Sequence, residues 1–341
     1  MIPVPRALVA LCLAVLGACE RSPSSPTLPA STGSPGSIES AGAAGSPESP
    51  GPADSSTPTS FASARRIVPA SATAVDFVCA LVGPERIAGV PEQAIDYSIL
   101  HSDDPRWAAT PRFFAYQAEP VLALEPDLVV VCPYQSRDTH ERLQGGGVPV
   151  FQLTEVATWD EARAMLLAVG ERLGESAKAD ELVADLDRRV AALERVAEAR
   201  KGVRAMCYSN FGSQGWSAGS HTTIGEIMRL AGVTNVVAEA GRRGHLTVSF
   251  EELIQFDPDV IVVGAPLTTP SSSAGDRGGA SEALLLREPT LAGLRAVRDR
   301  RILVLPAWHF ATGSHEIVHA AELLSVELDL LLASTAEAGR R

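Results

Sequence analysis

EPVLALEPDLVVVCP at Glu119–Pro133 and EELIQFDPDVIVVGAP at Glu251–Pro266 are two copies of one motif. Each copy contains a glutamate, a short apolar helix, a Pro-Asp pair and an unbroken run rich in β-branched residues. Because a helix rarely continues into a proline, each predicted helix ends just before the Pro-Asp pair. The run that follows is typical of a parallel strand buried on both faces. The repeat therefore predicts two similar α/β lobes, each with a glutamate at one helix start.

Strands and helices alternate on both sides of the repeat, which favours open parallel sheets. In the first half we expect strands at Ile67–Pro69, Arg86–Val90 and Pro149–Leu153, and helices at Ala72–Val82 and Arg137–Gln144. In the second half we expect strands at Arg204–Tyr208, Asn235–Ala238 and Ile302–Pro306, and helices at Thr223–Ala231 and Ser314–Leu332. Between the halves, residues 157–201 predict one long linking helix that could break at Gly174-Glu175-Ser176.

The N-terminus has the order of a secretory signal. Arg6 carries the one positive charge, an apolar core runs from Ala7 to Val15, and Leu16-Gly17-Ala18-Cys19 follows. The apolar core is too short to span a membrane. The ending resembles the lipobox of bacterial lipoproteins, which implies that Cys19 becomes the first mature residue and carries a lipid. The alternative is an ordinary signal peptide with a chance cysteine.

The stretch from Glu20 to about Ala64 is dense in Ser, Pro, Gly and Ala and almost free of large apolar residues. Such a segment cannot bury enough surface to offset its ordering entropy. As a flexible coil it would extend about 35–40 Å from the anchor, so we expect a tether. The rest of the chain, from Arg65, is long enough for one large domain or two lobes.

Composition narrows the possible partners. The chain is acidic, with a formal net charge of −12, and has no long basic run, which argues against a nucleic-acid partner. Of the five cysteines, Cys12 lies in the signal and Cys19 is the lipidation candidate. Cys79, Cys132 and Cys207 are widely spaced in apolar contexts, which favours buried free thiols. At most one disulfide could form among them.

Four stretches together resemble the ABC-transporter substrate-binding proteins that deliver vitamin B12 and iron–siderophore chelates. They are RIVPASATAVDFVCALVGPERIAGV from Arg65, the first repeat with ERLQGGGVPVFQL, IGEIMRLAGVTNVV with VSFEELIQFDPDVIVV, and AVRDRRILVLPAW near the end. The resemblance implies an α/β fold of two Rossmann-like lobes bridged by one long helix, with limited hinge motion and ligand in the cleft. The implied domains are a signal (1–18), the tether (19–64), lobes at 65–156 and 202–333, the linking helix (157–201) and a tail (334–341).

Open α/β sheets bind ligands at the carboxyl ends of their strands. Loops at those positions contain Trp216 and Trp308, large aromatics on which a flat macrocycle or aryl chelate could stack. Either tryptophan could instead plug the base of its loop. The full set of predicted ligand-binding residues is Ser71, Tyr97, Trp107, Tyr134, Trp216, His221, His245, Trp308 and His309.

The two repeated glutamates take a separate role from the resemblance. In the family, one glutamate on each lobe docks onto arginines of the permease dimer, and Glu119 and Glu251 fall at those positions. A carboxylate on each arm that meets a bidentate guanidinium would fix the orientation of the complex. Alternatively, both residues merely favour a helix N-terminus.

The segment His315-Glu316-Ile317-Val318-His319 matches H-E-x-x-H, the helix signature of zinc metalloproteases. A zinc protease also needs a third ligand and a substrate-binding edge strand, and no sequence context supplies them. We expect a non-catalytic role, such as contact of His315 with ligand or an adventitious metal. No Ser-His-Asp arrangement, phosphate loop or Gly-rich dinucleotide motif is found.

These patterns predict a lipid-anchored, extracytoplasmic solute-binding protein that is not an enzyme and that carries a large metal chelate to an ABC-importer permease dimer. Cobalamin is the favoured ligand, because the first segment with Asp96-Tyr97 looks most like the cobalamin-type members. A ferric siderophore is the second candidate, and haem is the third, since His309 or a tyrosine could ligate iron. We expect a monomer with no intrinsic cofactor. The rival classes are a secreted zinc hydrolase and a purely structural lipoprotein.

Overall fold

The computed structural model describes residues 60–101, 105–114, 117–200, 202–211, 214–266 and 278–338. They belong to one compact unit, Ser56–Arg341. The predicted signal, Cys19 and nearly all of the predicted tether lie outside the described residues. At the end of that tether, the amide of Phe61 donates to the carbonyl of Arg172 (2.6 Å) and Ala64 is buried. Packing of the folded unit therefore includes residues just before Arg65.

The N-terminal lobe is built on a parallel sheet of three strands in the order β1-β4-β5, of which β1 and β4 are fully buried. Its strands are β1 (Ile67–Pro69), β4 (Leu128–Val131) and β5 (Val150–Gln152), and a small parallel pair is formed by β2 (Val90–Pro91) and β3 (Arg112–Phe113). Its α-helices are α1 (Ala72–Cys79), α2 (Ala94–Tyr97), α3 (Ala118–Leu122) and α4 (Arg137–Gly145). Three 3₁₀ turns complete it, at Pro84–Arg86, Ile99–His101 and Pro105–Trp107.

The C-terminal lobe has a four-stranded parallel sheet in the order β12-β11-β6-β9 and an antiparallel sheet in the order β10-β8-β7. The parallel strands are β6 (Arg204–Cys207), β9 (Thr234–Asn235), β11 (Val260–Gly264) and β12 (Ile302–Leu305). The antiparallel strands are β7 (Ser209–Phe211), β8 (Gln214–Ala218) and β10 (His245–Val248). The helices are α7 (Thr223–Leu230), α8 (Val236–Glu239), α9 (Phe250–Phe256), α10 (Gly279–Arg287), α11 (Arg295–Arg298), α12 (Ala307–Phe310) and α13 (Ile317–Ala338), with a 3₁₀ turn at Pro289–Leu291.

The repeated Pro-Asp pair has the same structural role in both lobes. Asp127 accepts the amides of Arg65 and Arg66 at 2.7 and 2.9 Å, and Asp259 accepts the amide of Arg204 at 3.0 Å. Each aspartate thus joins the start of the repeat strand to the start of the first strand of its lobe. The strand pairing is the same in the two lobes. β1 pairs with β4 in the N-terminal lobe, β6 pairs with β11 in the C-terminal lobe, and both pairs are parallel.

The residue before each proline has left-handed backbone geometry. Glu125 has φ 49° and Asp257 has φ 38°. A proline disfavours the right-handed helical conformation of the residue before it, so α3 and α9 end here and the chain turns into the strand. The predicted helix–strand boundaries of both repeats are therefore confirmed.

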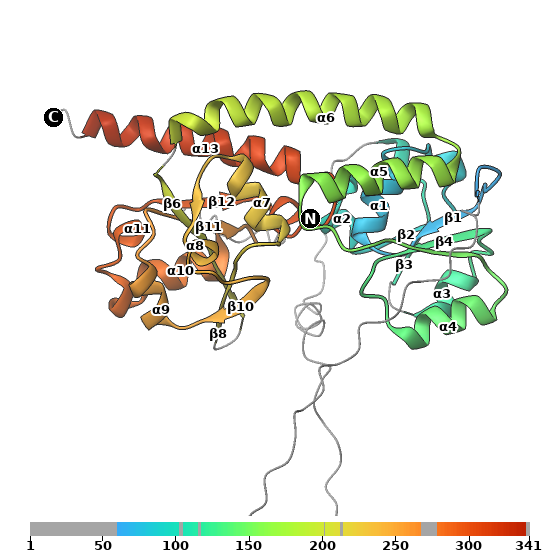
Figure 1. Ribbon diagram of the computed structural model, residues 1–341. Helices are drawn as coiled ribbons and strands as arrows, with labels where there is room; N and C mark the ends of the chain where they lie inside the picture. The colour runs from blue at the N-terminus through green and yellow to red at the C-terminus, as the bar shows by residue number, and fades with distance from the viewer. Residues whose placement is uncertain are drawn as a thin grey trace, which may run out of the picture. The chain divides into compact units, whose positions relative to one another are not determined.

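The predicted linking helix is two helices. α5 (Trp159–Leu173) ends at Gly174, whose φ is 73°, and α6 (Ser176–Ala197) folds back along it. A Cβ added at Gly170 would lie 2.4 Å from the Cβ of Ala179, so the absent side chain permits this close packing. Among the described helices, α6 crosses between the lobes, as Figure 1 shows, and it contacts α5 at one end and α7 and α13 toward the other. A short 3₁₀ turn, Glu198–Arg200, follows it.

Two predicted strands differ from the structure. Arg86–Val90 begins in a 3₁₀ turn, forms one isolated parallel bridge from Ile87 to Ile67, and enters strand β2 only at Val90. Asn235–Ala238 leaves β9 after Asn235 and forms α8, because the Asn235 side chain accepts the amides of Val237 and Ala238 and caps that helix. α13 runs to Ala338, past residue 334 where the sequence predicts a tail.

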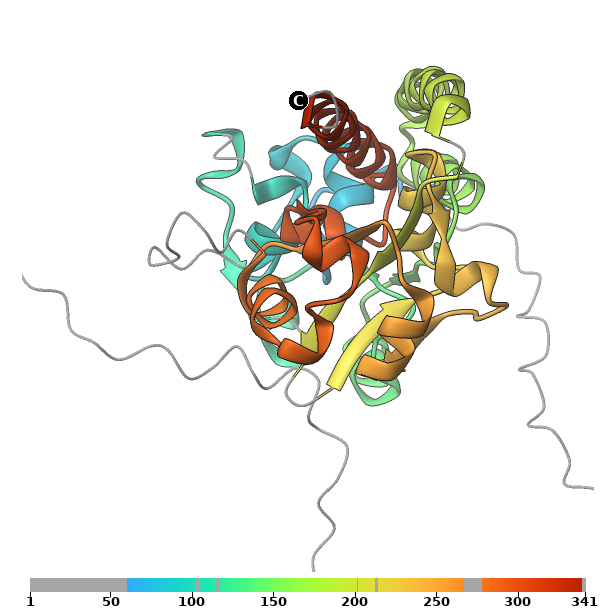
Figure 2. The ribbon, with the colours of Figure 1, turned by 90° about the vertical axis from the view of Figure 1, so that its left-hand side faces the viewer.

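The largest buried cluster of apolar residues runs through both lobes and the helices α5, α6 and α13. Figure 2 shows α6 and α13 nearly end-on, on the same side of the C-terminal strands. Two smaller clusters fill the other faces of the sheets, one in each lobe. The shared cluster means that the lobes are packed against common helices.

Candidate functional site

The predicted ligand loops follow β1, β4, β6 and β12 at their carboxyl ends, as expected for an open α/β sheet. Ser71 follows β1 and caps α1, because its hydroxyl oxygen accepts the amide of Ala74 at 3.0 Å. The Ser71 side chain is only partly buried. Ser71 therefore caps α1, whether or not it also contacts ligand.

Tyr134 is the most exposed aromatic residue of these loops, with 73% of its surface accessible. Partial desolvation, together with hydrogen bonding to the Glu155 carboxylate, raises the pKa of the Tyr134 phenol. The phenol is thus kept protonated near neutral pH. Phe114 is also exposed, whereas Cys132, two residues before Tyr134, is half-buried.

Trp216 and His245 share one face of the antiparallel sheet, which sequence reasoning did not predict. In the ladder Trp216 pairs with Thr247, and His245 pairs with Ala218, two positions along β8. Residues two apart on a strand point to the same face. Trp216 is 38% exposed and His245 is exposed, so the two rings belong to one solvent-facing surface.

Trp308 and His309 lie on α12, directly after β12, and both are half-buried. Their ring centroids are 5.9 Å apart in an edge-on arrangement. His309 Nε2 lies 3.7 Å from Glu316 Oε2, which connects α12 to the segment that precedes α13. The α12 side chains are therefore held partly within the protein.

Trp107 and Tyr97 differ from the exposed candidates. Trp107 is 6% exposed and belongs to the largest core cluster, which gives it a packing role. Tyr97 ends α2 and is half-buried. The long irregular stretch that contains them thus contributes part of the core, a possibility that an aromatic-rich sequence alone does not separate from a binding loop.

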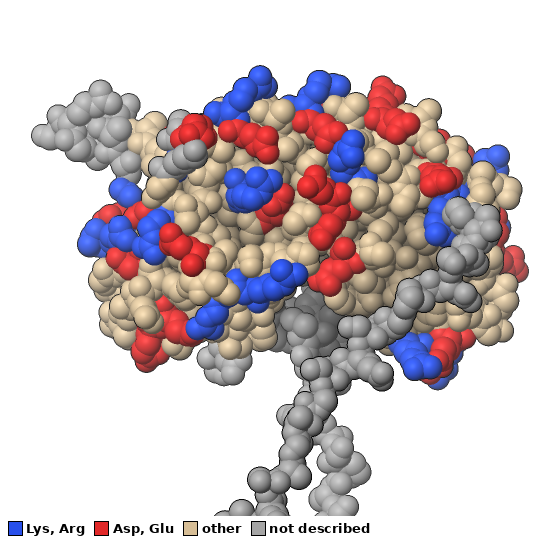
Figure 3. Space-filling view, viewed as in Figure 1, with Lys and Arg blue, Asp and Glu red and all other residues tan. Residues whose placement is uncertain are grey.

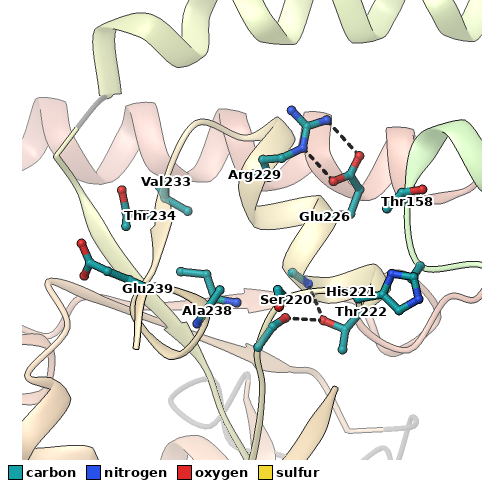
Figure 4. Close-up of a pocket in the computed structure, with 14 residues that line it drawn as sticks. Thr158, Ser220, His221, Thr222, Glu226, Arg229, Val233, Thr234, Ala238 and Glu239 are labelled. Atoms are coloured by element: carbon teal, nitrogen blue, oxygen red, sulfur yellow. Dashed lines mark hydrogen bonds and ion pairs between the residues drawn. The ribbon is translucent and has the colours of Figure 1, made fainter. Parts of the chain in front are cut away.

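A pocket of about 350 Å³ lies along α7 and contains one of the predicted residues, His221 (Figure 4). Thr158 and His221 lie at one end of it, and Thr234 and Glu239 lie at the other. His221 is exposed and has φ 57°, an unusual conformation for a residue with a side chain. The pocket does not contain the aromatic residues of the strand-end loops.

The wall of this pocket is fixed by Glu226. Its carboxylate accepts two bonds from the Arg229 guanidinium, at 2.7 and 2.9 Å, and one from the amide of Trp159 at 3.2 Å. The bond from Arg229 to Glu226 raises the pKa of the Arg229 guanidinium. Because Trp159 opens α5, these bonds join the linking helices to the C-terminal lobe.

Glu119 and Glu251 lie in the first turns of α3 and α9, at equivalent places in the two lobes. Both side chains are exposed. Arg142 Nη1 lies 3.2 Å from Glu119 Oε1, in an ion pair that is itself exposed. Hydrogen bonds from its own backbone and from Ser249 lower the pKa of the Glu251 carboxyl. On the face in Figure 3, side chains of both charges are interspersed over the described residues.

The HEIVH segment does not have the geometry of a zinc protease. His315 precedes α13, and both it and His319 are directed at Glu316, with nitrogen–oxygen distances of 3.6 and 3.0 Å. Across the described part of the chain, no three His, Cys, Asp or Glu side chains are grouped so that they could hold a metal ion. The motif therefore forms a carboxylate–imidazole cluster.

Cys79, Cys132 and Cys207 are free thiols. Burial raises the pKa of the Cys79 and Cys207 thiols, which makes both poor nucleophiles. The prediction of buried free thiols is confirmed for these two, and Cys132 is half-buried.

The sequence profile of one protein family, described as periplasmic binding protein, matches residues 80–308. The chain belongs to the periplasmic binding protein family. This family places it with extracytoplasmic substrate-binding proteins. Within the described ranges, every helix is too short or too polar to span a bilayer.

One curated relative of this periplasmic binding protein is the cobalamin-binding protein of Halobacterium salinarum, 31% identical over 147 residues. The match covers 43% of this chain and 40% of the relative, so the chain spans less than half of that protein's length.

Two solved structures show the same fold. The periplasmic haem-binding protein RhuT from Roseiflexus sp. RS-1 is 23% identical, with a TM-score of 0.65, and the match covers 77% of this chain and 97% of that one. The ABC-type Fe³⁺-hydroxamate transport protein from Saccharomonospora viridis is 22% identical, with a TM-score of 0.60, over 77% and 93% of the chains. The predicted two-lobe α/β fold, with parallel sheets and a bridging helix, is confirmed.

Proposed function

We propose that this periplasmic binding protein captures a metal chelate outside the cytoplasm and delivers it to an ABC-importer permease dimer. The observation that carries the ligand class is the 31% identity with a cobalamin-binding protein over 147 residues. Cobalamin is therefore the favoured cargo. The protein needs no cofactor of its own for this task.

The residues proposed to contact the ligand are those that the fold leaves accessible at the strand ends. Tyr134 on the N-terminal lobe and Trp216 with His245 on the C-terminal lobe offer ring faces for a flat macrocycle. Trp308 and His309, on α12, would contact the ligand with the edges of their rings. Ser71, Tyr97 and His221 are proposed as weaker contacts, and Trp107 would act through packing.

The properties of two aromatic residues bear on two other candidate cargoes, haem and a ferric siderophore. Haem would need an axial ligand, and a tyrosine or histidine can supply one. Glu155 disfavours the phenolate form of Tyr134, and His309 already faces Glu316. Both residues therefore suit a chelate that carries its own axial ligands better than they suit haem. A ferric siderophore would need no protein ligand to iron and is the second candidate.

Titration calorimetry of the mature protein with cyanocobalamin tests the proposal. We expect binding of one corrinoid per chain and an upward shift in melting temperature at saturation. Trp216→Ala should weaken binding, whereas Val326→Ala, which removes an exposed apolar side chain from α13, should not. Absence of heat and of stabilisation with cyanocobalamin, together with clear binding of a ferric siderophore or haem, would reassign the cargo.

Membrane anchoring and the absence of catalysis complete the proposed function. Cys19 is proposed to anchor the protein to the membrane, and incorporation of labelled fatty acid that Cys19→Ser abolishes would establish the anchor. The protein is also proposed to have no catalytic activity. Zinc-dependent peptide cleavage that Glu316→Gln removes would instead favour the hydrolase alternative.

A further inference from the structure

Glu316 is at the centre of a cluster that ligand capture alone does not explain. Its side chain is 11% exposed and lies among three imidazoles. Glu316 Oε2 is 3.0 Å from His319 Nδ1 and 3.7 Å from His309 Nε2, and Glu316 Oε1 is 3.6 Å from His315 Nε2. His309 belongs to α12, so one carboxylate contacts both α12 and the start of α13.

The charge of Glu316 is maintained by these neighbours. Burial opposes ionisation, but the hydrogen bond from His319 and the nearby imidazole of His309 outweigh it, so the pKa of the Glu316 carboxyl lies below its usual value. The positive charge of Arg189 on α6 also favours the ionised form of Glu316, although the direct partners of Arg189 are Glu322 and Asp185. A buried carboxylate without such partners would be strongly destabilising.

The segment just before Glu316 also contacts the N-terminal lobe. Ser314 is fully buried and donates its hydroxyl to Asp76 Oδ2 on α1 at 2.6 Å. The amide of Ile99 donates to the other oxygen of Asp76 at 2.8 Å. The His315 ring lies 5.4 Å from the ring of Phe77, also on α1. The chain between α12 and α13 is therefore fixed to the N-terminal lobe.

We propose that Glu316 is a positioning residue that holds α12, and with it Trp308 and His309, in place for ligand. This rests on the proposed function, in which α12 lines the ligand site. The carboxylate joins α12 to the start of α13, and Ser314 joins that start to Asp76. A change in ligand contact on α12 would thus be transmitted to the contact between the lobes.

Hydrogen exchange of the unliganded protein tests the positioning without any ligand. The amides of His309, Phe310 and Ala311 bond to the carbonyls of Pro306 and Ala307 within α12. In Glu316→Gln these amides should exchange about ten-fold faster, because the charged contact between Glu316 and His309 is lost. Peptides from β12 and from the middle of α13 should keep their wild-type rates.

Affinity for cyanocobalamin is the second readout. Glu316→Gln should weaken binding about ten-fold through loss of the same charged contact with His309. The matched control is Glu322→Gln, which removes a charge from the same helix but pairs with Arg189 of α6. It should change neither α12 exchange nor affinity. If Glu316→Gln fails to fold, His319→Ala removes only the half-exposed donor and should speed α12 exchange to a smaller extent.

The outcomes separate this inference from the proposed function. Unchanged α12 exchange in Glu316→Gln, or equally faster exchange along the whole of α13, would overturn the positioning role. If the wild type binds no chelate but α12 still loosens selectively in Glu316→Gln, the positioning stands and the proposed function fails.

Discussion

Asp76 and His315 are two titratable residues whose buried environments act in opposite directions on stability. Burial raises the pKa of the Asp76 carboxyl well above its usual value, even though Ser314 and Ile99 donate to it. Burial also lowers the pKa of His315 to about 4, against the favourable charge of Glu316. No described group accepts from or donates to Nδ1 of His315. Both residues therefore favour their uncharged forms in the folded protein.

The His315 shift predicts how stability depends on pH. Between pH 6.5 and about 4 the unfolded chain binds a proton at this position and the folded protein does not, so stability falls as pH falls through that range. The full loss approaches roughly 3 kcal/mol, and it is complete below the folded pKa. Asp76 contributes with the opposite sign, because its protonated form is favoured in the folded state.

Urea unfolding of the wild type and of His315→Gln at several pH values separates the two effects. The difference in unfolding free energy between the proteins should change steadily from pH 6.5 to 4, as the wild type loses its His315 contribution. Two curves that stay parallel over this range would contradict the predicted titration of His315.

For single residues, the sequence predicted position within an element better than it predicted side-chain contacts. Glu119 and Glu251 could be placed at helix starts because their positions relative to the Pro-Asp pairs are the same. The role of Glu316 could not be predicted, because it depends on Ser314 reaching Asp76, which is 238 positions away. The HEIVH spacing matches a zinc-protease signature and gave no sign of the carboxylate–imidazole cluster, since spacing alone does not say where side chains are directed.

Among the elements, the pair α5–α6 depends on one close approach. Gly170 on α5 faces Ala179 on α6, and an added methyl group would lie only 2.4 Å from the Ala179 methyl. Overpacking of this kind costs about 1–3 kcal/mol, more than the helix propensity of roughly 1 kcal/mol that alanine gains over glycine.

Gly170→Ala should therefore lower the free energy of unfolding, and Ala179→Gly in the same chain should restore part of the loss by removing the facing methyl. A double-mutant cycle of unfolding free energies measures this coupling. Gly145→Ala is the control, because nothing lies within 4 Å of the added Cβ at the end of α4. Additive effects of the two changes would show that the helices do not meet at Gly170.

The buried parallel strands and the amphipathic helices were predictable, because hydrophobic runs and periodicity decide them locally. The sheet β7–β8–β10 was not, since its strands are short and mix polar with apolar residues, β8 contains a glycine, and pairing across the lobe stabilises them. The segment around Trp216 was expected to be a loop. Its pairing is what brings Trp216 and His245 onto one surface, a relationship no single segment reveals.

For the whole molecule, the repeat places one exposed carboxylate on each lobe. A surface carboxylate near a helix start contributes about 0.3–1 kcal/mol to folding, so its removal should leave the free protein nearly unchanged. At a docked interface, loss of one partner from a buried charge pair can cost roughly 2–5 kcal/mol. Glu119 and Glu251 are therefore expected to affect transport much more than ligand binding.

The double variant Glu119→Ala, Glu251→Ala should bind its chelate with near wild-type affinity, while uptake through the cognate permease is lost. Calorimetry and cellular uptake measure the two properties. Glu181→Ala, Glu194→Ala is the matched control, because it removes two exposed carboxylates from α6 and should leave uptake intact. Wild-type uptake in the first variant would exclude the docking role.

The bridging helix affects how empty and loaded forms of the protein would compete for the permease. α6 extends over 22 residues, roughly 33 Å, and packs on α5 at one end and on α7 and α13 toward the other, so we expect the spacing of the lobes to depend little on bound ligand. An empty carrier then presents the same pair of carboxylates to the permease as a loaded one. Empty and loaded carriers would compete for the same transporters, and uptake at a limiting cargo concentration should pass through a maximum as the amount of carrier rises.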